Sequence, residues 1–311
     1  MSAPPKIYEG DQVEVAHEIS CELGEGSLWH EELNCYLHVD IYGPSKMCSG
    51  PAVYLQSPYP GGAPTRCLPM KSFTGTVVPR KSGGLLVALK DGIYSVDISS
   101  GEATFLSNPD GIKTNRWNDG KCSPDGRFFG GTMGEPGKVE KGVGSLYVLN
   151  TDMTTRKVVP NVTISNGLAW DVSRKLMYYI DTPTGCVFAF DYDSSTGEAT
   201  NQRVAFSIPE GTGHPDGCCI DAEGNLWIAQ WGGWRVVCYN PSNGSVIAEV
   251  KLPAAHVSSC TFGGPGLGDL YITTAKEHLS EEERAAQPHA GDCFIVRNIG
   301  FRGVPSCSFL G

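Results

Sequence analysis

A degenerate repeat runs through this 311-residue sequence and leaves few folds open to it. Each unit begins with a polar residue, usually followed by glycine, and continues into short apolar runs. The six marks are Glu25-Gly26, Thr74-Gly75, Asp119-Gly120, Asn166-Gly167, Asp216-Gly217 and Ser259-Cys260. They are spaced 49, 45, 47, 50 and 43 residues apart. A period of about 40 to 50 residues is typical of β-propellers.

Within the units, runs rich in Val, Ile, Tyr and Phe alternate with polar turns, as in residues 122–133 and 219–230. The 39 Gly and 21 Pro favour many tight turns between short strands. A β-sandwich with extra strands would not show a regular period. We therefore predict one all-β domain over residues 1–311, a six-bladed β-propeller with four-stranded blades around a central channel.

Two segments fall outside the repeat. Residues 13–19 precede the first mark and are predicted to be a strand that completes the last blade and closes the ring, since propellers avoid open edges. Residues 278–287 are predicted to be a short helix on the rim. Ser280 would cap that helix, and Glu283 lies three residues later, as in a capping box.

Composition excludes several functional classes. The net charge is -10 and no Lys/Arg-rich run occurs, which argues against nucleic-acid binding. No apolar run reaches the roughly 18 residues of a membrane span. The 12 Cys form no C-x-x-C pair, and several lie in apolar runs, so we expect buried free thiols. Residues 1–10 contain no apolar core of a secretory signal, and we expect a cytoplasmic protein with no obligate protein partner.

The marks themselves suggest a site. If the units are equivalent, the polar residues of the marks converge near one mouth of the channel. Three carboxylates and one amide placed together would repel each other without a cation. Oxygen ligands of this kind suit Ca²⁺, Mg²⁺ or Mn²⁺. The alternative is that each Asx-Gly pair only makes a turn.

One mark lies in a segment that is denser in polar groups than a turn requires. The segment 115–120 reads Asn-Arg-Trp-Asn-Asp-Gly. Arg116 and Asn118 have donors that suit the hydroxyl or carbonyl groups of a ligand. The alternative for Arg116 is pairing with a neighbouring carboxylate.

Several stretches together resemble the senescence marker protein/regucalcin/gluconolactonase family, to which insect luciferin-regenerating enzymes are related. The similarity runs from about residue 20 to 275. The motifs that carry it are Gly24-Glu-Gly-Ser-Leu-Trp29, Asn115-Arg-Trp-Asn-Asp-Gly-Lys121, Gly131-Thr-Met133, Ser165-Asn-Gly-Leu-Ala-Trp170 and Pro215-Asp-Gly-Cys-Cys-Ile-Asp221.

The resemblance implies a six-bladed propeller with one catalytic divalent metal ion, Ca²⁺, Zn²⁺, Mn²⁺ or Mg²⁺. Its metal ligands fall on Glu25, Asn166 and Asp216, and its substrate-binding residues on Arg116 and Asn118. The family also uses an acidic residue shortly after Thr-Met. An ungapped count places that position on Pro136, so we assign the role to the preceding residue, Glu135.

The function we predict is metal-dependent hydrolysis of a small sugar lactone. Water polarised by the metal attacks the lactone carbonyl, and Asp216 or Asp119 takes the proton. Three other functions remain open: a calcium-binding regulatory protein, a hydrolase acting on phosphotriesters, and an enzyme acting on a luciferin-type substrate. Family membership does not fix the substrate.

Overall fold

A computed structural model describes residues 4–57, 59 and 64–311. The strands of the first four repeat units form four separate four-stranded antiparallel sheets. The first two sheets contain β3 (Gly24–His30), β4 (Cys35–Asp40), β5 (Ala52–Gln56) and β6 (Arg66–Pro69), then β7 (Thr74–Pro79), β8 (Leu85–Leu89), β9 (Gly92–Val96) and β10 (Ala103–Ser107). The next two contain β11 (Asn115–Cys122), β12 (Phe128–Gly134), β13 (Gly144–Leu149) and β14 (Thr155–Val162), then β15 (Ser165–Asp171), β16 (Leu176–Asp181), β17 (Cys186–Asp193) and β18 (Glu198–Ser207).

The remaining strands are assigned to one nine-stranded sheet. They are β19 (His214–Ile220), β20 (Leu226–Trp231), β21 (Arg235–Asn240), β22 (Ser245–Lys251), β23 (His256–Gly263), β24 (Asp269–Ala275), β25 (Cys293–Val296), β1 (Lys6–Tyr8) and β2 (Glu14–His17). A single residue pair, Trp231 and His256, joins β20 to β23 within this sheet. The two halves are therefore held together by one bridge rather than by a continuous ladder.

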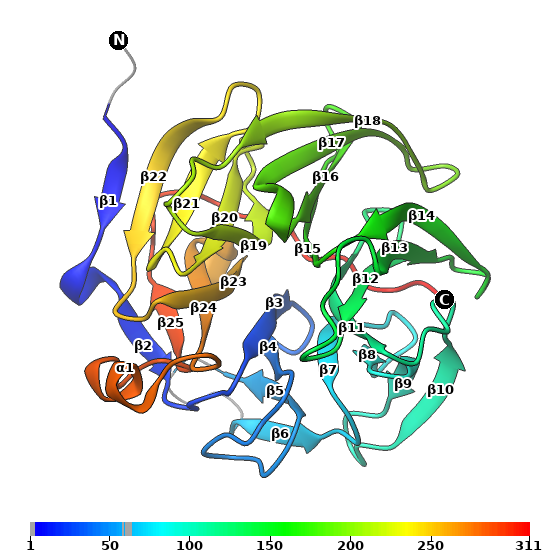
Figure 1. Cartoon of the computed structure of the whole chain (residues 1–311), viewed down its shortest axis with the longest axis horizontal. Helices are drawn as coiled ribbons and strands as arrows, with labels where there is room; N and C mark the ends of the chain where they lie inside the picture. Colours follow the sequence, from blue (N-terminus) through cyan, green and yellow to red (C-terminus); the bar gives the residue numbers. More distant parts are fainter. Residues whose placement is uncertain (1–3, 58, 60–63) are drawn as a thin grey trace.

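The sheets are arranged around a common centre (Figure 1). The first strands of the units, β3, β7, β11, β15, β19 and β23, each contact the next, and β23 contacts β3, so they form a closed ring. Large side chains fill the space between neighbouring sheets. Phe129 of β12 packs edge-on against Trp170 of β15, with ring centroids 5.3 Å apart. Trp227 and Phe262 make the same kind of contact between β20 and β23 at 5.5 Å.

The all-β prediction is confirmed, with a propeller-like arrangement of four-stranded sheets. The strand expected at residues 13–19 is β2, which pairs antiparallel with β25. The helix expected at 278–287 is the shorter α1 (Glu281–Ala286), capped by Ser280 in a capping box with Glu283. Three short 3₁₀ helices complete the elements of the described residues: η1 (Gly10–Gln12), η2 (Thr182–Thr184) and η3 (Pro265–Leu267).

All 12 cysteines lie in the described part of the chain, and each is a free thiol there. Nine of them are buried, as expected for small apolar side chains. No helix among the described residues combines the length and the apolar character needed to cross a membrane. The segment predicted to lack a secretory signal, residues 1–10, lies partly outside the described residues.

Candidate functional site

A β-bulge interrupts each of the six inner strands at or next to its mark. In β3 the register shifts between Glu25 and Leu28, in β11 between Trp117 and Gly120, and in β15 between Asn166 and Leu168. The inner strands β7, β19 and β23 carry the same irregularity. A bulge re-aims the side chains beside it and is common next to active sites. The repeated polar-Gly pattern therefore marks a repeated local geometry.

The glycines of the marks allow neighbouring inner strands to approach closely. A Cβ atom on Gly75 would lie 2.5 Å from the carbonyl oxygen of Trp117 on the next strand. A Cβ atom on Gly167 would lie 2.7 Å from the carbonyl oxygen of Asp216. Side chains at these two positions would push the strands apart. The marks consequently lie level with one another around the ring.

The structure corrects the sixth mark. The sequence places it at Ser259-Cys260, but the bulge in β23 falls between Val257 and Ser259, so the equivalent pair is Val257-Ser258. Ser259 instead accepts a hydrogen bond on its Oγ atom from the backbone N–H of Ser27, at 3.2 Å. The Thr74 hydroxyl donates to the carbonyl of Ser72, at 3.0 Å. Among the described residues, neither the Ser259 hydroxyl nor the Thr74 hydroxyl forms a hydrogen bond with a carboxylate of another mark.

Three carboxylates from different inner strands meet in this region. Glu25, Asp119 and Asp216 each expose only 5% of their surface. Burial raises the pKa of Glu25 well above its usual range, and the charges of Asp216 and Asp119 raise this pKa further. Burial and then Asp119 raise the pKa of Asp216 in the same way. The pKa of Asp119 is also raised by burial, an effect that Lys121 partly offsets.

Two amide side chains and a threonine link the carboxylate strands. Asn118 donates through its Nδ2 atom to the carbonyl of Ser165 (2.8 Å) and to the Oδ1 atom of Asn166 (3.0 Å). Asn166 in turn donates to the Thr182 hydroxyl (2.8 Å), which donates to the carbonyl of Pro215 (2.8 Å). This chain of hydrogen bonds holds β11, β15 and β19 together beside Asp216.

Arg116 is a cationic side chain whose charge acts on both Glu25 and Asp216. Its Nη1 atom donates to Asn118 Oδ1 at 2.6 Å and to the carbonyl of Trp117 at 3.1 Å. Its guanidinium lies 5.4 Å from the ring centre of Tyr42. The Nε atom is buried and has no hydrogen-bond partner among the described residues. Arg116 thus keeps a donor available, whereas both amide hydrogens of Asn118 are already used within the protein.

The residues present fit a hard divalent cation. The Oδ1 atom of Asp216 is buried and has no hydrogen-bond partner in the described part of the chain. A buried carboxylate oxygen without a partner is costly, and two further carboxylates lie close to it. No group of three or more His, Cys, Asp or Glu side chains among residues 4–57, 59 and 64–311 has the spacing of a metal cluster. The predicted set of Glu25, Asn166 and Asp216 contains only two such side chains and an amide oxygen.

Glu135 lies at the end of β12 and is held in an ion pair. Its Oε2 atom accepts a hydrogen bond from Lys90 Nζ at 2.5 Å. The Lys90 ammonium lies 5.9 Å from the ring centre of Phe73, which packs against Tyr42 beneath Arg116. Glu135 is therefore connected to the Arg116 side of the channel through Lys90 and two aromatic rings. No described contact joins it to the carboxylate group.

Two residues that the structure places here could not be selected from the sequence pattern. Thr182 follows the second strand of its unit, β16, and Lys121 follows its mark by two residues. Both act across strands from different repeat units. For Thr182 the available signal was its position just after the second strand of its unit.

Fold and site together define a class of protein: a propeller-like, all-β molecule with buried carboxylates grouped at its central channel. Residues 23–276 match the model of the "SMP-30/Gluconolactonase/LRE-like region". The chain belongs to this SMP-30/gluconolactonase/LRE-like family.

Individual relatives of this family also match most of the chain. Regucalcin from Xenopus laevis is 36% identical over 294 residues, which cover 93% of this chain and 95% of that protein. Human regucalcin is 36% identical over 296 residues, covering 94% and 96%. Among solved structures, a luciferin-regenerating enzyme has a TM-score of 0.86 at 30% identity and covers 96% of this chain and 99% of its own. A calcium-binding protein, regucalcin, from Agrobacterium tumefaciens has a TM-score of 0.87 at 23% identity, covers 99% of both chains and supports the fold alone.

Proposed function

We propose that this protein is a divalent-metal-dependent hydrolase that opens a small sugar lactone. The observation that carries the proposal is the group of three buried carboxylates, in which Asp216 Oδ1 has no hydrogen-bond partner among the described residues. A family named for gluconolactonase among its members supports the reaction type. The closed ring of six inner strands supports a six-bladed propeller, in which the single Trp231–His256 bridge joins two separate blades.

In this proposal Glu25, Asn166 and Asp216 hold the cation. Ca²⁺, Mg²⁺, Mn²⁺ and Zn²⁺ all accept such oxygen ligands. When bound, the cation acts as a Lewis acid toward the lactone carbonyl and lowers the pKa of water. Asn118 orients the Asn166 amide through its hydrogen bond to Oδ1, and Thr182 fixes the other end of that amide.

The proton released during attack goes to Asp119 or Asp216. Both are buried beside Glu25, and burial raises the pKa of Asp119, which is not a proposed metal ligand, above its usual value. A carboxylate with a raised pKa is a stronger base near neutral pH. Asp119 is the better placed of the two to act only as a base, because it is not one of the proposed metal ligands.

Substrate orientation falls to the Arg116 side of the site. The buried Nε atom of Arg116 has no hydrogen-bond partner among the described residues, and we propose that it donates to a lactone oxygen. Asn118 is the second substrate contact predicted, and it also supports Asn166. Glu135 is the third, and Lys90 holds its carboxylate in place at the end of β12. With free cysteines throughout, we propose the reducing cytoplasm as the compartment in which the protein acts.

A calcium-binding protein without catalytic activity is the second candidate. The name of the curated relatives, regucalcin, favours it. Both candidates need the same metal ligands. They differ in whether Arg116 has a substrate to bind.

The test is hydrolysis of D-glucono-δ-lactone by purified protein. The reaction is monitored through the acid that it releases at constant pH. A phosphotriester is assayed in parallel, and each assay is run with chelator and after metal is restored. We expect lactone turnover that chelator abolishes and metal restores. Metal binding without turnover of either substrate would favour the calcium-binding protein and contradict the hydrolase.

A further inference from the structure

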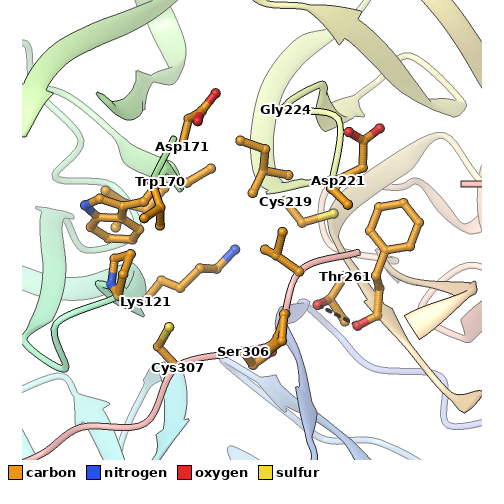
Figure 2. Close-up of a pocket in the computed structure, with 18 of the residues that line it drawn as sticks. Lys121, Trp170, Asp171, Cys219, Asp221, Gly224, Thr261, Ser306 and Cys307 are labelled. Atoms are coloured by element: carbon orange, nitrogen blue, oxygen red, sulfur yellow. Dashed lines mark hydrogen bonds between the residues drawn. The ribbon is translucent and has the colours of Figure 1, made fainter. Parts of the chain in front are cut away.

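A cavity lies on the same inner strands as the carboxylate site but further along them. Its volume is about 480 Å³. It is lined by residues that follow the marks in five inner strands, such as Lys121 after Asp119 and Cys219 after Asp216. The marks lie level with one another, so the cavity occupies the opposite end of the channel. Figure 2 shows this pocket and the C-terminal residues Ser306 and Cys307 on its edge.

The wall of this pocket is mostly apolar. It includes Leu168, Trp170, Ile220, Phe262 and, from the C-terminal segment, Val304. A cavity of this size with apolar walls and few polar groups is the usual form of a small-molecule site. The apolar wall would pack against the apolar part of a ligand, and the few polar groups would bind the polar group of that ligand.

Lys121 is the cationic group in this wall. Its half-buried side chain extends from β11 toward the middle of the pocket (Figure 2). Among the described residues, the ammonium donates one hydrogen bond, to the carbonyl of Cys218 at 2.6 Å. An ammonium has three donors, so two remain for a ligand. A carboxylate provides acceptors of opposite charge, and charge-assisted hydrogen bonds are the stronger kind.

Two of the three acidic residues that line the pocket are already bound within the protein, and the third, Glu223, is exposed. Asp221 accepts hydrogen bonds from Asn225 and from the Trp227 indole, at 3.1 Å for the latter. Asp171 accepts from Arg174 at 3.0 Å. Their charges are therefore directed at protein donors rather than at the cavity.

We propose that this pocket binds a small monocarboxylic acid with an apolar body. The carboxylate lies against the Lys121 ammonium, and the body packs on the apolar wall around Trp170 and Ile220. This pocket lies further along the channel than the proposed catalytic site, although the Lys121 charge also acts on Asp119 there. The existence of the pocket does not depend on the reaction carried out at that site.

Calorimetry with octanoate tests the proposal, with 1-octanol as the uncharged counterpart. We expect octanoate to bind the wild-type protein at least tenfold more tightly than octanol. Lys121→Met, which keeps the length of the side chain and removes its charge, is expected to weaken octanoate at least tenfold and leave octanol unchanged. Lys141→Met, at an exposed lysine, is the matched control and should bind octanoate like the wild type.

Two further variants locate the binding. Ser306→Trp places a large ring at the pocket edge without altering an inner strand, and it should abolish octanoate binding. It also decides the matter if Lys121→Met does not fold. Arg116→Ala removes the guanidinium group beside the carboxylate site and should leave octanoate binding intact. No octanoate binding to the wild type, equal binding of acid and alcohol, or a loss with Arg116→Ala but not with Ser306→Trp would each overturn the proposal.

Discussion

Arg116 and Asn118 are two residues apart on β11, yet the structure gives them different hydrogen-bonding states. Arg116 keeps a buried donor without a partner among the described residues, while Asn118 uses both amide hydrogens within the protein. The sequence predicts the same role for both. The difference depends on side-chain orientation across strands from separate repeat units, which spacing along the chain does not encode.

We expect Arg116→Ala to lower kcat/KM for gluconolactone by about ten- to a thousandfold, because it removes a buried polar contact to substrate. Metal affinity should change less than threefold, since Glu25, Asn166 and Asp216 remain. Steady-state kinetics and calorimetric metal titration of the same preparation measure both. Unchanged kinetics would mean that Arg116 does not contact substrate.

Asn118→Ala provides the contrast. It removes the donor that orients Asn166 Oδ1, so metal affinity and activity should fall together. The same two measurements apply. A fall in activity at full metal occupancy would instead assign Asn118 to substrate alone, as the sequence predicts.

At the scale of the strands, the polar-Gly marks were predictable because a β-bulge and a close approach between strands both favour glycine. The sixth mark was misplaced because β23 carries Ser258 at the bulge in place of glycine, and no sequence signal remains there. The pairing of β2 with β25 was predictable from the need to close the ring. Thr182 and Lys121 were not, since their partners lie on strands of other units.

We expect Gly167→Ala to destabilise the protein by about 1–3 kcal/mol, typical of overpacking, because its Cβ atom would meet the Asp216 carbonyl at 2.7 Å. Gly50→Ala is the matched control: its Cβ atom would meet nothing within 4 Å. Urea denaturation of both variants gives the free energies of unfolding. Equal stability of the two would show that the inner strands adjust without cost.

Two histidines near the closing strand, the half-buried His17 and the buried His38, make stability depend on pH. Burial lowers the pKa of His17 on β2 to about 4 and that of His38 on β4 to about 3. An unfolded histidine titrates near about 6.5. The unfolded chain therefore binds more protons between these values, and stability is full above about pH 6.5 and is lost as pH falls toward 4.

His38→Gln should reduce this loss of stability between pH 7 and pH 5. His278→Gln, at an exposed side chain, should leave it as in the wild type. Urea midpoints at the two pH values measure the difference for each variant. A pH dependence in His38→Gln equal to that of the wild type would rule out His38 as a source.

At the scale of the whole molecule, the ring of inner strands brings together groups that are far apart in the chain. Glu25, Asp119 and Asp216 come from different units, and the charges of Asp119 and Asp216 both raise the pKa of Glu25. The repeat period predicted the fold class and this convergence. It did not predict the pocket around Lys121, because that cavity depends on which side chains of five strands and the C-terminal segment leave space between them.

The central claim is that one divalent cation, held by Glu25, Asn166 and Asp216, is required for lactone hydrolysis. The most direct measurement is the initial rate of gluconolactone hydrolysis as metal is titrated into metal-free protein, for the wild type and for Asp216→Asn. We predict no enzymatic rate without metal, a rate that rises and saturates with one cation per chain in the wild type, and no rise for Asp216→Asn. Full activity in the metal-free protein, or a normal titration curve for Asp216→Asn, would contradict it.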